Sequence, residues 1–353
     1  MIKHNKWIGK IYRDAILSRT RYEKLCLDKN ERITSFSKSF FNRFISKINS
    51  KIIISYPEVR KLYYALANLH KIKTNQLFLT SGVDGAIKNC FELFVSKGDK
   101  VITLNPTFAM VDIYCKIFQA KRFNINYDSK LRINVNNLIR SIDRKTSLII
   151  IANPNSPTGT VIDKIDLEKI IKKANLLNIP ILIDEAYYEF YNITSLPLIK
   201  KYKNLIIART FSKAYGLAGL RVGYLISNKK IAKLLFNLKP MYEVNSIAIL
   251  ASTMMIKDSK IHKHYINETK KGFKLITKFL VNREIDFIKT YANFIYINVG
   301  NKINYFYKKL LKVGILTKKG LSIKGYKNYL RVTLGPEKEM KKIIKKLIKL
   351  KAI

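Results

Sequence analysis

Short apolar runs alternate with helical periodicity, and this alternation restricts the fold of the chain more than any other feature. Between about residues 56 and 240, four runs rich in branched side chains indicate buried strands: KVITL (100–104), SLIIIANP (147–154), IPILIDEA (179–186) and NLIIART (204–210). Segments with helical spacing separate them. This order is typical of an α/β fold in which helices flank a large, mostly parallel sheet.

The pattern changes after residue 240 to long, Lys-rich amphipathic helices and a few short apolar runs. This predicts a smaller α+β domain. We expect an N-terminal arm (1–40) that joins the small domain, a large domain (41–245) and a small C-terminal domain (246–353). No run approaches the roughly 18 apolar residues of a membrane span, and the cysteines are widely spaced. A cytoplasmic protein with no membrane partner is expected.

The chain is strongly basic, with 67 Lys and Arg against 24 Asp and Glu and a formal charge of +43. Such a charge often indicates a nucleic-acid or membrane partner. The lysines are scattered through every segment here, so we expect no nucleic-acid partner. His262 and His264 lie in a Lys-rich segment and are expected to be solvated, and the histidine spacing predicts no metal site.

The stretch TFSKAYGLAGLRVGY (210–224) directly follows the last of these strands. An unprotonated lysine amine such as that of Lys213 can form a Schiff base with a carbonyl compound. Ser212 and Arg221 suit an anion such as phosphate, and the glycines between them let the backbone approach a ligand. The alternative for Lys213, taken alone, is a solvated lysine in a plain loop.

Asp184 stands at the end of an apolar strand in LIDEAYYEF (182–190). A carboxylate is costly to bury there unless it meets a cation. A protonated pyridine nitrogen would be such a partner, and the ring would then act as an electron sink. Tyr187, three residues on, could donate its hydroxyl to a ring oxygen. The alternatives for Asp184 are a helix N-cap and a metal ligand.

Other strand ends carry further candidates. Gly82, Val83 and Asp84 open a helix whose free N–H groups and dipole favour a phosphate. The turn ANPNSPTGT (152–160) can present an Asn or Ser to the same ring, and Phe108 could stack on a planar cofactor. Each feature also has a plain interpretation: an ordinary helix start, a loop and a core aromatic residue.

Together these segments resemble the fold-type I, pyridoxal 5'-phosphate-dependent aminotransferases, in order from about residue 27 to 335. The signature S-K-x-x-G-L-x-G-x-R-x-G-Y is highly specific to them. Within this class the chain looks most like the histidinol-phosphate aminotransferases, on the motifs LDKNE (27–31), YP (56–57), ANF (292–294) and LRVTLG (330–335). The resemblance implies amino-group transfer between L-histidinol phosphate and 2-oxoglutarate in L-histidine biosynthesis, through a Schiff base of the cofactor on Lys213.

The resemblance also implies a role for each matching residue. The cofactor phosphate would be bound by Gly82, Val83, Asp84, Ser212 and Arg221. The cofactor ring would be contacted by Asp184 at its nitrogen, Tyr187 and Ser156 at its oxygen, and Phe108 on one face. Tyr56 would reach the cofactor of a neighbouring subunit, which implies a homodimer. The substrate would be bound by Arg331, Lys318 and Asn30.

Several positions depart from the family pattern. N-E-N-P has become Asn30-Glu31-Arg32-Ile33, the usual Glu after the phosphate-loop Asp is Gly85, the usual Asn before P-T-G is Ser156, and Lys318 stands for an expected arginine. A lysine lacks the planar fork that binds phosphate bidentately. The departures concern substrate affinity and specificity more than the chemistry.

Two other interpretations stay open. One is a different enzyme of the same branch, either an aromatic aminotransferase or a threonine-phosphate decarboxylase. The other is a binding or regulatory protein on an aminotransferase scaffold, with its basic surface used for nucleic acid. The presence of Lys213, Asp184, Tyr187 and Arg221 argues against lost catalysis.

Overall fold

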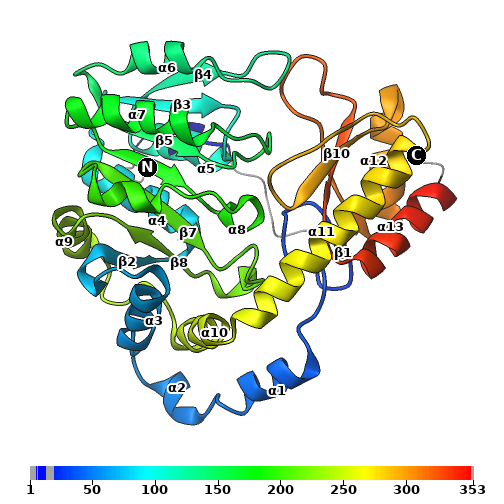
Figure 1. Cartoon of the computed structure of the whole chain (residues 1–353), viewed down its shortest axis with the longest axis horizontal. Coiled ribbons are helices and arrows are strands. Elements are labelled where there is room, and N and C mark those ends of the chain that lie inside the picture. Colours follow the sequence, from blue (N-terminus) through cyan, green and yellow to red (C-terminus); the bar gives the residue numbers. More distant parts are fainter. Residues whose placement is uncertain (1–4, 6, 13–19, 351–353) are drawn as a thin grey trace.

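The computed structural model describes residues 5, 7–12 and 20–350, and its largest element is a seven-stranded sheet of order β2-β8-β7-β6-β5-β3-β4 (Figure 1). Its strands are β2 (Leu77–Thr80), β3 (Lys100–Asn105), β4 (Lys121–Asn126), β5 (Thr146–Ala152), β6 (Ile181–Asp184), β7 (Leu205–Thr210) and β8 (Gly223–Ile226). β8 is antiparallel to both of its neighbours, and the other pairs are parallel. The expected α/β class with a mostly parallel sheet is confirmed.

Helices bury both faces of this sheet, which explains why its strands are continuously apolar. In β5, Leu148 and Ile150 belong to a core shared with α4 (Gly82–Phe94) and α5 (Ala109–Ile117). Ile149 and Ile151 point to the opposite face. The core on that face also holds side chains of α1 (Lys38–Ile45), α3 (Arg60–His70), α6 (Val135–Ser141), α7 (Lys164–Leu176) and α10 (Ser246–Lys257).

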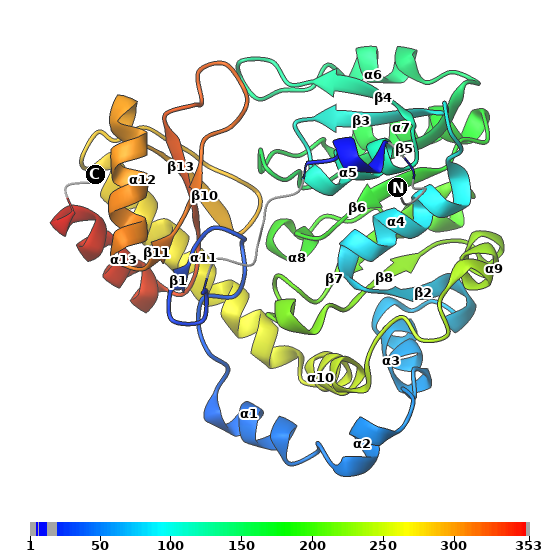
Figure 2. The ribbon, with the colours of Figure 1, turned by 180° about the vertical axis from the view of Figure 1, so that it is seen from behind.

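A second, antiparallel sheet of order β12-β13-β10-β9 lies beside the first (Figure 2). Its strands are β9 (Phe287–Ile288), β10 (Phe294–Asn298), β12 (Lys318–Lys319) and β13 (Tyr329–Thr333). Its own core includes side chains of α11 (Ser259–Val281), α12 (Ile303–Lys312) and α13 (Glu337–Lys349). The remaining elements of four or more residues are α2 (Ser50–Ile54), α8 (Tyr188–Tyr191), α9 (Lys229–Leu238) and a 3-10 helix over Leu196–Lys200.

The N-terminal part of the chain contacts elements that lie beside each of the two sheets. The indole Nε1 of Trp7 donates to the carbonyl of Ile117, on a helix of the large sheet (3.2 Å). Further along, β1 (Leu25–Cys26) pairs in parallel with β11 (Ile315–Leu316), next to the second sheet. Residues 25–33 therefore run between the two sheets. Within the described ranges, no helix combines the length and the apolar character needed to cross a bilayer.

The start of α11 packs against the large sheet, and this changes the surroundings of His262. Its ring lies 4.4 Å, centroid to centroid, from that of Tyr215, and burial lowers the pKa of His262 to about 4. The expectation that His262 is solvated is wrong. α11 is rich in lysine overall, but one of its faces is buried and His262 lies on that face. His264, two residues on, is exposed as expected.

Candidate active site

The predicted site residues gather where the parallel strands of the large sheet end. β5, β6 and β7 run in parallel register, so that their carboxyl ends share one edge. These ends lead to Ser156, Asp184 and Lys213. α8, which follows β6, lies on the side of the sheet that faces β10 (Figure 1). The site is therefore located between the two sheets.

Lys213 lies close to two other predicted residues. Its Nζ is 5.6 Å from the centroid of the Tyr187 ring, and its charge acts on the buried carboxyl of Asp184. The same amine donates a hydrogen bond to the carbonyl of Lys29 (2.8 Å). The sequence segments around 184 and 213 thus meet as expected, and the segment around residue 29 joins them.

Asp184 is 6% exposed, and its Oδ1 accepts a hydrogen bond from the N–H of Ala186 (2.9 Å). Burial raises the pKa of Asp184 to about 7, although that N–H and the charge of Lys213 act in the opposite direction. A carboxyl group in this condition becomes fully ionised when a cation is placed next to it. The site therefore fits a ligand that brings a protonated ring nitrogen to Asp184.

Tyr187 is buried, and its hydroxyl accepts a hydrogen bond from Nδ2 of Asn30 (2.9 Å). Its ring meets that of Phe294 edge-on, at 6.0 Å between centroids. A phenol that accepts one bond keeps its own proton for another acceptor. Asn30, predicted to bind substrate, is thus in direct contact with the predicted partner of the ring oxygen.

Gly82, at the start of α4, and Arg221 form a cradle that fits an anion. Gly82 has φ +71°, and a β-carbon there would lie 3.0 Å from Nη2 of Arg221. A β-carbon on Gly223 would approach the backbone of Gly82 to 2.8 Å. Only glycines allow the helix start to come this close to the guanidinium. The free N–H groups of the first helical turn and the arginine charge then point to one place.

Hydroxyl groups that sequence reasoning missed support this cradle. Thr210 donates from Oγ1 to Oγ of Ser212 (3.0 Å) and accepts from the Ser212 N–H (3.1 Å). Thr80 donates to the carbonyl of Gly82 (2.9 Å). Thr80 and Thr210 both pair with Gly223 in the sheet, so this register would have identified them once the strand order was known.

Asp84 and Val83 contribute to the cradle differently from the glycine. The carboxylate of Asp84 accepts a hydrogen bond from the hydroxyl of Tyr114 (2.9 Å), which turns it toward α5. The side chain of Val83 is buried in the core of that face. Both residues would therefore meet a phosphate through their backbone N–H groups.

The turn at residues 153–160 is fixed by its own asparagines. Asn153 exchanges two hydrogen bonds with the backbone of Ile162 (2.9 and 3.0 Å). Asn155 donates to the carbonyl of Pro106 (3.0 Å) and to Oγ1 of Thr158 (2.8 Å). The side chain of Ser156 makes no hydrogen bond within the described part of the chain, so its hydroxyl is available to a ligand.

This turn is also attached to the second sheet. The hydroxyl of Tyr296 donates to the carbonyl of Pro157 (2.9 Å), and the N–H of Tyr291 donates to the carbonyl of Gly159 (2.8 Å). A β-carbon on Gly159 would lie 2.2 Å from the β-carbon of Thr290.

Phe108, predicted to cover the cofactor, is partly buried at the start of α5.

Lys318, Arg331 and Tyr296 face one another across the second sheet. Their register positions are directly opposite, so their side chains share one face, and Tyr296 shows that this face looks toward the turn. Arg331 is buried and donates from Nη2 to the carbonyl of Asp28. Its buried Nε has no partner among the described residues. Lys318 is exposed.

The two side chains that depart from the family pattern after Asn30 each pack against a glycine. The guanidinium of Arg32 lies over the ring of Tyr265 (4.2 Å to the centroid). A β-carbon on Gly216 would lie 2.5 Å from Cδ of Arg32. A β-carbon on Gly335 would lie 2.2 Å from Cδ1 of Ile33. Both side chains thus dock on glycine surfaces, one of them in the loop after Lys213. At Gly85 a β-carbon would come no closer than 3.4 Å to Ser81, an ordinary contact.

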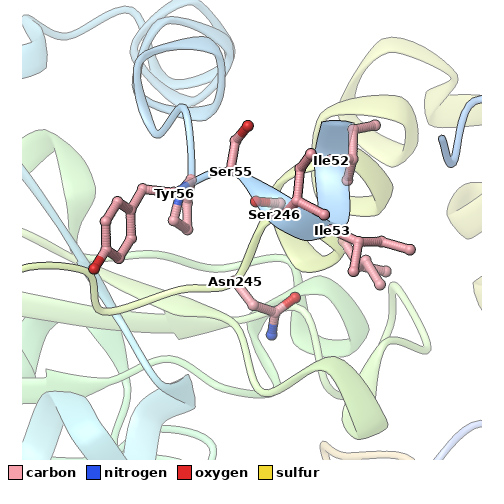
Figure 3. Close-up of a pocket in the computed structure, with 9 residues that line it drawn as sticks. Ile52, Ile53, Ser55, Tyr56, Asn245 and Ser246 are labelled. Atoms are coloured by element: carbon pink, nitrogen blue, oxygen red, sulfur yellow. The ribbon is translucent and has the colours of Figure 1, made fainter. Parts of the chain in front are cut away.

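Tyr56 lies on the outer surface and is 75% exposed. Its ring stacks on Tyr242 at 4.8 Å, beside a groove lined by residues 52–57 and 245–247. Figure 3 shows the Tyr56 ring directed away from Ile52 and Ile53. Tyr56 is therefore not grouped with Lys213, Asp184 and Tyr187 of its own chain.

A buried ionic network adjoins Asp184 and was missed in the sequence. Arg209 binds Glu185 through Nη2 (2.9 Å) and Nε (3.1 Å), and it also donates to Thr194 (2.7 Å) and contacts His70 (3.3 Å). Burial first, and then the charge of Arg209, lower the pKa of His70 to about 3. The sequence contained one sign of this network: an arginine within an apolar strand, such as Arg209, requires a buried acceptor.

The geometry as a whole fits pyridoxal 5'-phosphate. The cradle of Gly82 and Arg221 suits its phosphate, and the buried carboxyl of Asp184 suits its protonated ring nitrogen. Tyr187 retains a hydroxyl proton for the ring oxygen, and Lys213 supplies the amine for its carbonyl carbon.

Comparisons with known proteins point in the same direction. Residues 46–347 match the family model described as aminotransferase class I and II. The chain is 34% identical over 329 residues to the histidinol-phosphate aminotransferase of Clostridium novyi (strain NT), covering 91% of this chain and 90% of that protein. It is 34% identical over 343 residues to the protein of that name from Caldanaerobacter subterraneus subsp. tengcongensis, covering 93% and 95%.

Solved structures are similar over almost the whole chain. The histidinol-phosphate aminotransferase of Clostridium acetobutylicum has a TM-score of 0.81 at 27% identity and covers 93% of this chain and 97% of its own. The protein of that name from Sinorhizobium meliloti, in complex with pyridoxal 5'-phosphate, has a TM-score of 0.86 at 20% identity, with coverages of 99% and 98%. The second similarity concerns the fold.

Proposed function

Since this chain belongs to the aminotransferase class I and II family, we propose that it transfers the amino group of L-histidinol phosphate to 2-oxoglutarate in L-histidine biosynthesis. The observation that carries this proposal is the agreement between the relatives and the site. Two curated relatives with this activity in their names cover at least nine tenths of the chain. Arg331, whose buried Nε has no partner in the described part of the chain, lies in line with Lys318 on the face toward the turn.

The cofactor of this enzyme is pyridoxal 5'-phosphate, which supplies the electron-withdrawing ring on which amino-group transfer depends. We propose that Asp184 keeps the ring nitrogen protonated, while Gly82, Ser212 and Arg221 hold the phosphate. Ser156 and Tyr187 are proposed to contact the ring oxygen, and Phe108 one face of the ring.

Lys213 is proposed as the residue that moves the proton. Its Nζ would move the proton between the substrate carbon and the cofactor, acting as a positioned general base and acid. Arg331 and the exposed Lys318 bind the distant anion, which is a phosphate in one substrate and a carboxylate in the other. Anchoring of that anion sets the position of the reacting carbon, and position supplies much of the rate.

The cofactor assignment is tested by reduction with borohydride followed by mass spectrometry of the peptides. We expect a visible absorption band that borohydride bleaches, with the adduct on Lys213, and no such band in Lys213→Ala. The substrate assignment is tested by measuring kcat/KM for each amino donor. Faster turnover of phenylalanine, tyrosine or O-phosphothreonine than of histidinol phosphate would reject it.

We also propose a homodimer in which Tyr56 reaches the cofactor of the partner subunit. The supporting observation is an exposed apolar surface around Tyr56, made of Ile53, Ile54 and Met241. A patch of this kind marks an interaction site, and Tyr56 is itself 75% exposed on it. Sedimentation of Ile54→Glu should give a monomer. Leu176→Glu, at an equally exposed position on α7, should leave the dimer intact.

The domain division and the location are proposals as well. We propose the same three parts with α10 counted in the large one, because Ala248 and Met255 pack in a core of the large sheet. A cytoplasmic location is supported by the three cysteines, each of which is a free thiol. Fractionation of cells that produce the protein tests the location.

A further inference from the structure

Residues 28–30 form hydrogen bonds to several predicted site residues in succession. The first carbonyl of this segment accepts from Arg331, and the second accepts from Lys213 (2.8 Å). The side chain of Asn30 donates to the hydroxyl of Tyr187 (2.9 Å). One short segment therefore touches the substrate-anion arginine, the catalytic amine and the partner of the ring oxygen.

Asn30 is held in place by the second sheet. Its N–H donates to Oγ1 of Thr333 (3.1 Å), and its carbonyl accepts from Nδ2 of Asn293 (3.1 Å). The hydroxyl of Thr333 also donates to Oδ1 of Asn30 (3.4 Å). The amide oxygen of Asn30 thus faces Thr333, and its nitrogen faces Tyr187. The side chain is 1% exposed, so water does not compete for the contact.

This contact decides what the Tyr187 hydroxyl can do. Its oxygen accepts from Asn30, so its proton is left for a different acceptor. Hydrogen bonds in a chain polarise one another, and a hydroxyl that accepts a bond becomes a better donor. Asn30 therefore both orients the hydroxyl and strengthens its donation.

We propose that Asn30 is a positioning residue that acts on the cofactor through Tyr187, and that it does not bind substrate itself. This inference rests on the proposed function. When residues 28–30 are seated between Arg331 and Lys213, the Tyr187 hydroxyl is a strong donor to the cofactor ring oxygen.

The ionisable groups that face Tyr187 come from three elements. They are Lys213 after β7, Tyr296 on β10, and Asp184 at the end of the strand that precedes Tyr187. All of them stay in place when only the side chain of residue 30 is changed. A hydroxyl that donates to the ring oxygen stabilises its anionic form and lowers the pH at which the visible band of the loaded enzyme changes. Loss of Asn30 should therefore raise that pH.

The test is a spectrophotometric pH titration of the cofactor-loaded enzyme and its variants. Asn30 has φ +57°, so Asn30→Gly removes the amide without backbone strain. We expect the midpoint to rise by about half a pH unit to one unit, the scale of one neutral hydrogen bond. Tyr187→Phe should raise it further, and Asn30→Gly should add nothing in the Tyr187→Phe background.

Thr333→Val is the matched control, because it loosens the same segment and leaves the amide in place; its midpoint should shift less than that of Asn30→Gly. Asn30→Asp, which tolerates the same φ and cannot donate when ionised, replaces the glycine variant if that variant fails to take up cofactor. An unchanged midpoint in Asn30→Gly, an equal rise in the Tyr187→Phe background, or an equal rise in Thr333→Val would overturn the inference. A wild-type enzyme with no band would overturn the proposed function as well.

Discussion

Arg209 and Glu185 form an ion pair at 2.9 Å in which the side chains are 2% and 1% exposed. Glu185 immediately follows Asp184, and its N–H donates to the carbonyl of Ala208 on the next strand (2.9 Å). The pair thus links the ends of β6 and β7 directly behind the carboxyl group that is proposed to meet the cofactor.

Removal of one partner of this pair should destabilise the protein strongly. In Arg209→Met the charge of Glu185 would stay buried without a cation beside it, which costs about 3–5 kcal/mol of unfolding free energy. Urea unfolding of the cofactor-free protein measures this loss. Lys341→Met, which breaks the exposed pair with Glu337 (2.7 Å), should cost less than about 1 kcal/mol. Equal losses in the two variants would contradict the importance of the buried pair.

Gly82→Ala should weaken cofactor binding by about tenfold or more, the scale of one hydrogen bond to a charged group. The new methyl group would press on Nη2 of Arg221, and the positive φ adds backbone strain. Titration of the cofactor-free enzyme with pyridoxal phosphate measures the dissociation constant.

The matched control for this prediction is Gly98→Ala. Gly98 has φ +89°, and a β-carbon there would have no neighbour within 4 Å. This variant should lose stability through the same backbone strain and bind the cofactor normally. If both variants bind the cofactor equally, Arg221 does not form the proposed cradle with Gly82.

The stability of the cofactor-free protein should depend on the protonation of Asp184. Burial raises the pKa of Asp184 to about 7 from 3.8, so between about pH 4 and 7 the folded state keeps a proton that the unfolded chain has lost. The stabilisation of the folded state by this proton is complete below about pH 4 and is lost as the pH rises to about 7. In this range the free energy of unfolding falls by up to about 1.4 kcal/mol per pH unit.

Asp184→Asn isolates this effect. Burial also raises the pKa of Glu189 to about 8 and lowers that of His70, but both groups are present in the variant and cancel in the difference. Unfolding measured at pH 5, 6 and 7 should therefore show the wild type losing stability relative to Asp184→Asn. A constant difference would show that the carboxyl titrates normally. Bound cofactor should flatten the trend in the wild type, because it places a cation beside Asp184.

Arg331→Gln should reduce kcat/KM for histidinol phosphate by about 10- to 100-fold, the worth of a charge-assisted hydrogen bond. The buried Nε of this residue has no partner among the described residues, so a substrate anion can bind there. Histidinol without its phosphate is the control and should lose much less. Lys318→Met should have the smaller effect of the two variants, because that side chain is exposed. Equal losses with histidinol and its phosphate would place the phosphate elsewhere.

The centre of the large sheet could be predicted because its strands are buried on both faces. The runs at 100–104, 147–154, 179–186 and 204–210 correspond to β3, β5, β6 and β7. β4 (KRFNIN) was not anticipated, because it is the edge strand and most of its side chains are outside the core. The strands β2 and β8 were not anticipated either.

Local motifs were sufficient to predict that Lys213, Asp184 and Tyr187 lie close together, because each stands at or just after the end of a recognisable strand. The contact between Asn30 and Tyr187 joins residues 157 positions apart, and its partners belong to different sheets. The burial of His262 likewise depends on the surface against which α11 packs. Such features follow from the relative placement of the sheets, about which a single sequence carries no direct signal.

The attachment of the 153–160 turn to the second sheet restricts how this enzyme can diversify. Tyr296 is the neighbour of Arg331 in the sheet and is bonded to the turn that carries Ser156. A mutation that reshapes β10 will therefore also act on the turn that carries Ser156, the residue proposed to contact the cofactor ring oxygen. Evolution toward a new amino donor meets less conflict at Lys318, which has no such tie to the turn among the described contacts.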